Sequence, residues 1–171
     1  MQKQHTFLAV LWAAVILWMG LIFSFSAETA EASGETSESV LEQILRILDA
    51  DFETYSAEES EAVLERYSRL IRKTAHFCIY TVLGFLISSA LTFQNRIFRT
   101  LSQRNVFLFS LSAGSAYAVS DEIHQYFVPG RSCQISDMML DSAGVLLGVS
   151  ALFLFVFLLR KAGAKKSSAV S

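Results

Sequence analysis

The sequence lacks the features that mark several common kinds of protein. It has only two cysteines, Cys78 and Cys133, which are too few for a disulfide framework, and whether they pair stays open. It contains no Cys-x-x-Cys or His-x-x-x-His pair, so it does not predict a structural zinc site. It also has neither a Walker loop nor the Rossmann glycine pattern. Nothing therefore indicates a nucleotide-driven mechanism or a nucleic-acid partner.

Long apolar runs dominate what is present. Hydrophobic residues make up 53% of the 171 residues and form four blocks, at about 7–26, 74–93, 105–123 and 138–159. A helix needs about 20 residues to cross a hydrocarbon core of roughly 30 Å, which matches each block. A soluble bundle would show a polar stripe with a period of 3.6 residues, and the last block shows none over its final turns. We predict an all-α integral membrane bundle of four transmembrane helices, forming a single domain over residues 1–171.

The first block has one alternative interpretation. A single Lys precedes it and small residues follow it, at Ser24, Ser26 and Ala27, as in a cleaved signal peptide. The apolar run is longer than the hydrophobic region of a typical signal peptide, which favours a membrane span.

Acidic and basic residues are separated along the chain. Of 16 acidic residues, 12 lie between Glu28 and Glu65. The segments before the first block, between the second and third, and after the fourth contain no acidic residue and carry only basic ones: Lys3; Arg96, Arg99 and Arg104; Arg160, Lys161, Lys165 and Lys166. Short loops rich in Lys and Arg stay cytoplasmic. The pattern predicts a multi-pass protein of the cell membrane, with both termini cytoplasmic and residues 27–73 and 124–136 outside.

The outer loop 27–73 is the only long polar segment. Its first part, 27–37, is typical of an exposed linker. Ser39 with Glu42, and Ser56 with Glu59, have the spacing of capping boxes and predict two short amphipathic helices at about 39–48 and 56–71. These helices can cover the outer mouth of the bundle, or lie on the bilayer and gate lipid access. Their acidic composition favours the first interpretation.

Polar residues, most of them ionisable, gather at the outer ends of three predicted spans, where ionisable groups are costly and usually mark a site. They occur at helical spacing, as Arg72, His76 and Tyr80 on one span and as Asp121 and Gln125 on the next. Asp137, Asp141, Gly144 and Gly148 share a stripe on the last span, where the glycines allow another helix to approach closely. The Pro129-Gly130 turn brings Arg131 back toward the bundle.

These residues can carry out chemistry or serve structure. We take Asp121, His76 and Glu122 as candidate catalytic residues, with His76 as a general base oriented by a carboxylate of another span. Candidate substrate-binding residues are Arg72, Lys73, Tyr80, Gln125, Arg131, Asp137 and Asp141, and the arginines can clamp a phosphate. No cofactor is specified, although these acidic groups can ligate a divalent cation. In the structural alternative, charges snorkel to the interface, Asp137 caps a helix, and Asp121 pairs with Arg131.

The same residues carry a family resemblance. Arg72-Lys73-x-x-His76-Phe77-x-x-Tyr80-x-x-Leu83-Gly84 resembles the second-span signature of the VanZ-like family. Ser120-Asp121-Glu122-x-His124-Gln125-x-Phe127-x-Pro129-Gly130-Arg131 and Asp137-x-x-x-Asp141-x-x-Gly144-x-x-x-Gly148 resemble its second half. The resemblance covers about residues 20–150, and this chain has Asp141 where many relatives have Asn.

The resemblance implies a role in the bacterial cell envelope, linked to resistance to the glycopeptide teicoplanin. It implies as partners the lipid bilayer and either a lipid-linked cell-wall precursor or a glycopeptide at the outer face. Two functions stay open. One is a membrane enzyme acting on a lipid or cell-wall precursor, and the other is a non-catalytic protein that binds a lipid, antibiotic or envelope partner.

Overall fold

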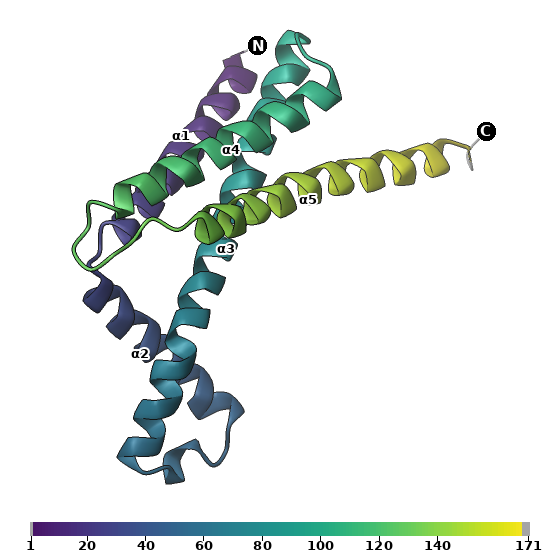
Figure 1. The fold of residues 1–171 in the computed structure, drawn as a ribbon. Coiled ribbons are helices and arrows are strands. Elements are labelled where there is room, and N and C mark those ends of the chain that lie inside the picture. The colour runs from purple at the N-terminus through teal and green to yellow at the C-terminus, as the bar shows by residue number, and fades with distance from the viewer. Residues whose placement is uncertain (1, 169–171) are drawn as a thin grey trace.

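The part of the chain that the structure describes consists of helices joined by short connections, with no strand. The computed structural model describes residues 2–168, with side chains up to Gly163. The helices are α1 (Gln2–Ser26), α2 (Ala30–Leu48), the 3-10 turn η1 (Phe52–Thr54), α3 (Ala57–Phe98), α4 (Gln103–Gln125) and α5 (Ile135–Ser168). In Figure 1, α1, α4 and the second half of α3 lie together, α5 crosses α3, and α2 packs against the first half of α3. The prediction of an all-α fold is confirmed.

Three helices are long and apolar enough to cross a membrane: α1, α3 and the part of α5 up to Gly163. The fourth predicted span, α4, is not among them. Its buried positions recur at every third or fourth residue and include Ser110, Gly114, Ala118 and Asp121. Small and polar side chains therefore face the neighbouring helices, and they lower the overall hydrophobicity of α4.

The prediction for the segment between α1 and the second span was wrong in its boundaries. Residues 27–37 are not an exposed linker, because α2 begins at Ala30, with the Thr29 side chain accepting a hydrogen bond from the backbone of Ala32. Ser39 therefore lies inside a helix and caps nothing. The Ser56–Glu59 capping box is present, but it starts a continuous helix of 42 residues in place of a short one. Alanine and glutamate favour helix at both places, and no glycine or proline interrupts α3 before Gly84.

Glycines set the close packing of α3 against α5. A Cβ atom added at Gly84 would lie 2.3 Å from the backbone oxygen of Val145, and one added at Gly144 would lie 2.5 Å from that of Phe77. At Gly148 it would lie 1.9 Å from the backbone oxygen of Thr81. The predicted approach of another helix to the Gly144 and Gly148 stripe is confirmed.

Hydrogen bonds fix α1 against α3 and α4. The Trp18 indole donates to the backbone oxygen of Ile79 at 2.9 Å, and the Tyr117 hydroxyl donates to that of Met19 at 2.7 Å. Both side chains are amphipathic and partly buried, so they satisfy a polar group while packing their rings on apolar neighbours. The second half of α1 is thereby held against α3 and α4.

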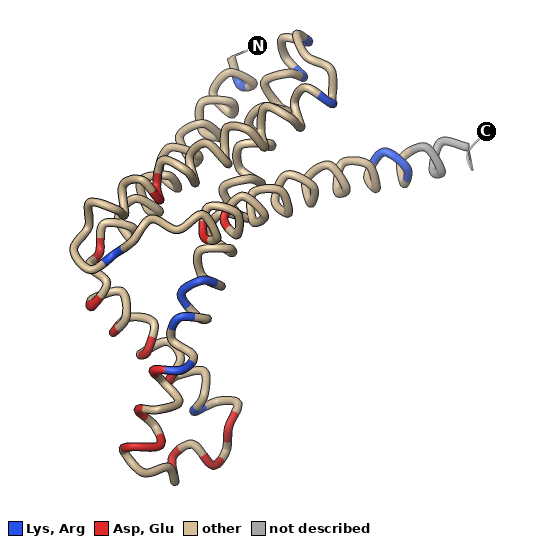
Figure 2. Tube along the Cα trace, in the orientation of Figure 1, with Lys and Arg blue, Asp and Glu red and all other residues tan. Residues whose placement is uncertain are grey.

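Charge separates along the fold as it does along the sequence. Figure 2 shows the acidic residues concentrated on α2, η1 and the start of α3, and basic residues at the start of α1, around the α3–α4 turn and late in α5. The side chains of Lys165 and Lys166, which contribute to the charge pattern, lie outside the described residues. Cys78 and Cys133 are both free and exposed.

Candidate functional site

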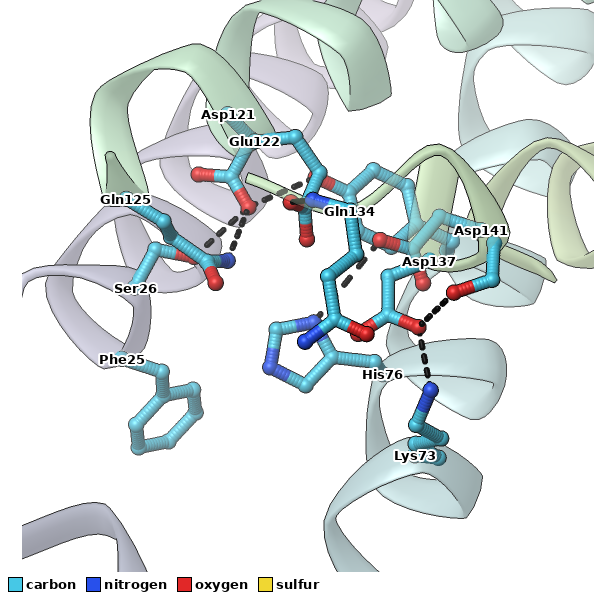
Figure 3. Close-up of polar contacts among 12 residues, drawn as sticks. Phe25, Ser26, Lys73, His76, Asp121, Glu122, Gln125, Gln134, Asp137 and Asp141 are labelled. Carbon is cyan, nitrogen blue, oxygen red and sulfur yellow. Dashed lines mark hydrogen bonds and ion pairs between the residues drawn. The ribbon is translucent and has the colours of Figure 1, made fainter. Parts of the chain in front are cut away.

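A small polar pocket lies where α3, the end of α4, the α4–α5 turn and the start of α5 meet. Its volume is about 90 Å³, and Ala30 at the start of α2 forms part of its wall. Eight of the predicted site residues line it: Arg72, Lys73, His76, Glu122, Gln125, Arg131, Asp137 and Asp141. Figure 3 shows several of these side chains converging from α3, α4 and α5. Residues far apart in the sequence therefore share one site.

The other two predicted residues, Asp121 and Tyr80, are not among the residues that line the pocket. One oxygen of Asp121, Oδ2, accepts hydrogen bonds from the Ser26 hydroxyl at 2.6 Å and the Tyr80 hydroxyl at 3.0 Å. The Gln125 amide donates to the same oxygen at 3.3 Å. Asp121 is 3% exposed. This network joins α1, α3 and α4 behind the pocket, which gives Asp121 the geometry of a positioning residue.

Ser26 is the network member that our sequence analysis did not select as a site residue. It is fully buried at the last position of α1. The only signal for it in the sequence is its position as a polar residue closing the first apolar block. Its hydroxyl also accepts a hydrogen bond from Gln125 at 3.3 Å, which strengthens the connection between α1 and α4.

Arg131 ties the α4–α5 turn to the end of α1. Gly130 adopts a positive φ of 75°, and the Arg131 guanidinium then donates to the backbone oxygen of Glu28 at 2.9 Å and to Gln125 Oε1 at 3.2 Å. A third, longer bond reaches the backbone oxygen of Phe25 at 3.4 Å. The structure thus brings Arg131 back to the bundle as predicted, but without an ion pair to Asp121 among the described residues.

Electrostatics at Arg131 follow from this position. Burial lowers the pKa of its guanidinium, and the nearby positive charge of Arg72 lowers it further. A guanidinium nevertheless stays protonated in proteins, so Arg131 remains a cation. Most of its donors already bond to the chain, which leaves little of the planar fork for a bidentate phosphate clamp.

The remaining charged residues form contacts across helices. Lys73 on α3 forms an ion pair with Asp137 in the first turn of α5. Glu122 on α4 accepts a hydrogen bond from the backbone of Gln134, just before α5, at 2.9 Å. Arg72 has no carboxylate within 4.0 Å among the described residues, so it is the pocket cation most available to an anionic ligand.

Asp141 is the most isolated charged group in the pocket. It is 1% exposed, and neither of its carboxylate oxygens has a hydrogen-bond partner. The nearest side chain that can carry a positive charge is the imidazole of His76, with 3.8 Å between Nδ1 and Oδ2. Burying a carboxylate without partners is costly, so this pair is the strongest sign of a site in the molecule.

The pocket as a whole mixes both signs of charge. Three carboxylates and three permanent cations line it, together with His76. No group of three or more His, Cys, Asp or Glu among the described residues could hold a metal ion. The arrangement can bind a small polar group that offers both acceptors and donors, and the histidine–carboxylate pair can move a proton.

Comparison with known proteins gives one match. The sequence model of the VanZ/LLP1 family matches residues 11–158. No curated protein and no solved structure matches the chain. The matched range includes every residue that lines the pocket.

Proposed function

The chain belongs to the VanZ/LLP1 family and is a membrane protein, and from this premise we propose that it binds the polar head group of a lipid-linked cell-wall precursor in the bacterial envelope. The polar pocket is the proposed binding site. The pocket accepts only a small group, since its volume of about 90 Å³ is well below the ~300–1,000 Å³ of pockets that enclose whole drug-sized ligands. The rest of such a ligand would lie in the bilayer.

We further propose a topology of four spans in one domain, with α4 as the third. Basic residues at the start of α1, in the α3–α4 turn and late in α5 support cytoplasmic ends, because short basic segments stay inside. The pocket then lies at the outer face, where cell-wall precursors are found. Exposed aromatic residues support a membrane interface at this level: Tyr126 is 66% and Phe127 is 75% exposed, directly beyond Gln125.

The observation that carries the proposal is the pair formed by buried Asp141 and half-buried His76. A carboxylate without hydrogen bonds beside an imidazole is arranged to meet a donor from a ligand, such as a sugar hydroxyl or an amide. Arg72 lines the same pocket without a carboxylate partner and is suited to the phosphate of a polyprenyl carrier. The ligand class therefore combines a phosphate with a hydrogen-bond donor.

Catalysis on the bound group is the second candidate function. The observation that favours it is the 3.8 Å separation of His76 Nδ1 and Asp141 Oδ2, since a carboxylate beside the imidazole can orient it as a general base. Simple binding requires only that both groups offer hydrogen bonds. The two functions differ in whether the ligand is chemically changed.

The binding test compares Arg72→Gln with Arg69→Gln, an exposed arginine one turn earlier on α3 and outside the pocket. Native mass spectrometry of the full chain with polyprenyl phosphate should show binding weakened roughly 10-fold or more by Arg72→Gln, because a charged hydrogen bond contributes about 1.5–3 kcal/mol. Arg69→Gln should bind like the wild type. Equal binding by both variants would contradict the proposed phosphate site.

A cellular test addresses the glycopeptide link. We propose that expression of the chain in a teicoplanin-susceptible Gram-positive host raises the inhibitory concentration of teicoplanin, and that Asp141→Asn abolishes the increase while the protein still reaches the membrane. Unchanged susceptibility with the wild-type chain would discard the resistance role alone.

Product analysis of the bound precursor with wild type and His76→Gln then separates catalysis from binding.

A further inference from the structure

A second cavity lies at the opposite, basic end of the bundle. It occupies about 840 Å³ between the start of α1, the end of α3 and the second half of α5. In Figure 1, the far part of α5 runs away from α1, so the two helices diverge at this end of the bundle. Its apolar walls are formed by Phe7, Leu11, Phe93, Leu152, Val156 and Leu159.

Three arginines line the same cavity, namely Arg96, Arg99 and Arg160. None has a carboxylate within 4.0 Å among the described residues. The sequence contains no Asp or Glu in 1–27, 66–120 or 142–171, so no acidic side chain lies close to these arginines along the chain. Like charges gathered beside an apolar cleft repel one another, and an anion at this position would relieve that repulsion.

The backbone at Arg99 provides an independent observation. Arg99 ends α3 in the left-handed conformation, with φ 51°, a position that glycine usually occupies. A residue with a Cβ atom is strained there. A glycine at this position would relieve the backbone strain, yet the sequence has an arginine. Violations of local backbone preference are expected at functional sites, so the Arg99 side chain is a candidate for ligand binding.

The lining of this cavity also includes a residue with a buried polar atom. Thr92 lines the cavity, and its hydroxyl oxygen is buried without a hydrogen-bond partner. Such a group is satisfied by a ligand atom that accepts a hydrogen bond, for example an ester oxygen.

We propose that this cavity binds an anionic phospholipid, with its phosphate at Arg96, Arg99 and Arg160 and an acyl chain along the apolar walls. The lining offers a partner for each part of such a lipid: arginines for the phosphate, Thr92 for an ester oxygen and apolar side chains for the hydrocarbon. Basic pockets between membrane helices bind anionic head groups in this way. The lipid site is separate from the polar pocket and does not depend on the function proposed for it.

The test measures phospholipid binding to the full chain by native mass spectrometry, with phosphatidylglycerol, phosphatidylethanolamine and inorganic phosphate as probes. The variant Arg96→Gln/Arg160→Gln removes two charges at the cavity, and Arg66→Gln/Arg69→Gln removes two exposed charges elsewhere. The wild type should prefer phosphatidylglycerol over phosphatidylethanolamine, and the cavity variant should bind it roughly 10-fold or more weakly, as expected for lost charged hydrogen bonds. The control variant should bind normally. Equal binding by the two variants overturns the proposal, as does inorganic phosphate displacing the lipid.

A second variant keeps the test independent of folding. Arg99→Gly should weaken lipid binding and raise the unfolding temperature of the lipid-free protein, because it removes a ligand group and relieves backbone strain together. A purely structural arginine would not give this combination.

Finally, cysteines placed at Leu11 and Val156 should not form a disulfide in lipid-loaded protein. Rapid crosslinking between these cysteines would show that α5 closes the cavity. Dimerisation through the cavity that is unaffected by Arg96→Gln/Arg160→Gln would show that a second copy of the chain occupies it. Either result overturns the proposal.

Discussion

Replacing Gly148 by alanine should separate α3 from α5. The added Cβ atom would lie 1.9 Å from the backbone oxygen of Thr81 and 2.7 Å from the backbone nitrogen of Phe85. The closer distance is about 1.5 Å short of an ordinary contact, and backbone atoms cannot rotate away as a side chain can. Overpacking costs about 1–3 kcal/mol, and this contact belongs at the upper end. Alanine regains about 1 kcal/mol of helix propensity, so we expect a net loss of about 2 kcal/mol.

Gly20→Ala is the matched control. Gly20 also lies within an apolar helix, but a Cβ atom there meets nothing within 4 Å. Only the propensity gain applies, so the two variants should differ by about 3 kcal/mol. Unfolding in detergent micelles with increasing sodium dodecyl sulfate, followed by circular dichroism, measures the difference. Equal stability of the two variants would refute close packing of α3 on α5, and with it the position of Asp141 beside His76.

Three further predictions concern topology and polar contacts. In a cysteine-free background, cysteines at Glu35 and Ser132 should react with an impermeant thiol reagent in intact cells, whereas one at Gln103 should not; labelling at Gln103 would invert the proposed orientation. Asn95→Ala should cost about 1–3 kcal/mol in the same unfolding assay, because the buried Asn95 side chain donates to the backbone oxygen of Leu101 and accepts from its backbone nitrogen, at 2.8 Å each. Tyr80→Phe should cost about 1.5–3 kcal/mol, since the hydroxyl donates to a buried carboxylate, and an unchanged midpoint would show that this bond contributes nothing.

The gathering of the site residues could be predicted from sequence because helical spacing fixes which residues share a face. Arg72 and His76 are four apart on α3, and Asp137 and Asp141 are four apart on α5. All four line the pocket. The division of roles among the residues could not be predicted. Asp121 accepts its shortest hydrogen bond from a serine 95 positions earlier, and no local pattern records so distant a partner.

The errors in the helix boundaries have a physical cause. Only Ser39 and Ser56 in residues 27–60 precede a glutamate at capping-box spacing, and the fold uses Ser56 but not Ser39. Thr29 lacks this signal and still caps α2, because the backbone nitrogen of Ala30 bonds to the oxygen of Pro129, which fixes the start of α2 against the α4–α5 turn. A tertiary contact of this kind overrides the local signal.

The uninterrupted length of α3 has a mechanical consequence. At 1.5 Å per residue, its 42 residues span about 63 Å, roughly twice the thickness of a hydrocarbon core. The helix has no glycine or proline between Ala57 and Leu83, so nothing in this stretch favours a kink. It packs on α5 at the glycine contact described above. Lys73 and His76 lie on α3, whereas Asp137 and Asp141 lie on α5. A displacement of the first half of α3, against which α2 packs, would therefore change the distances within these two pairs.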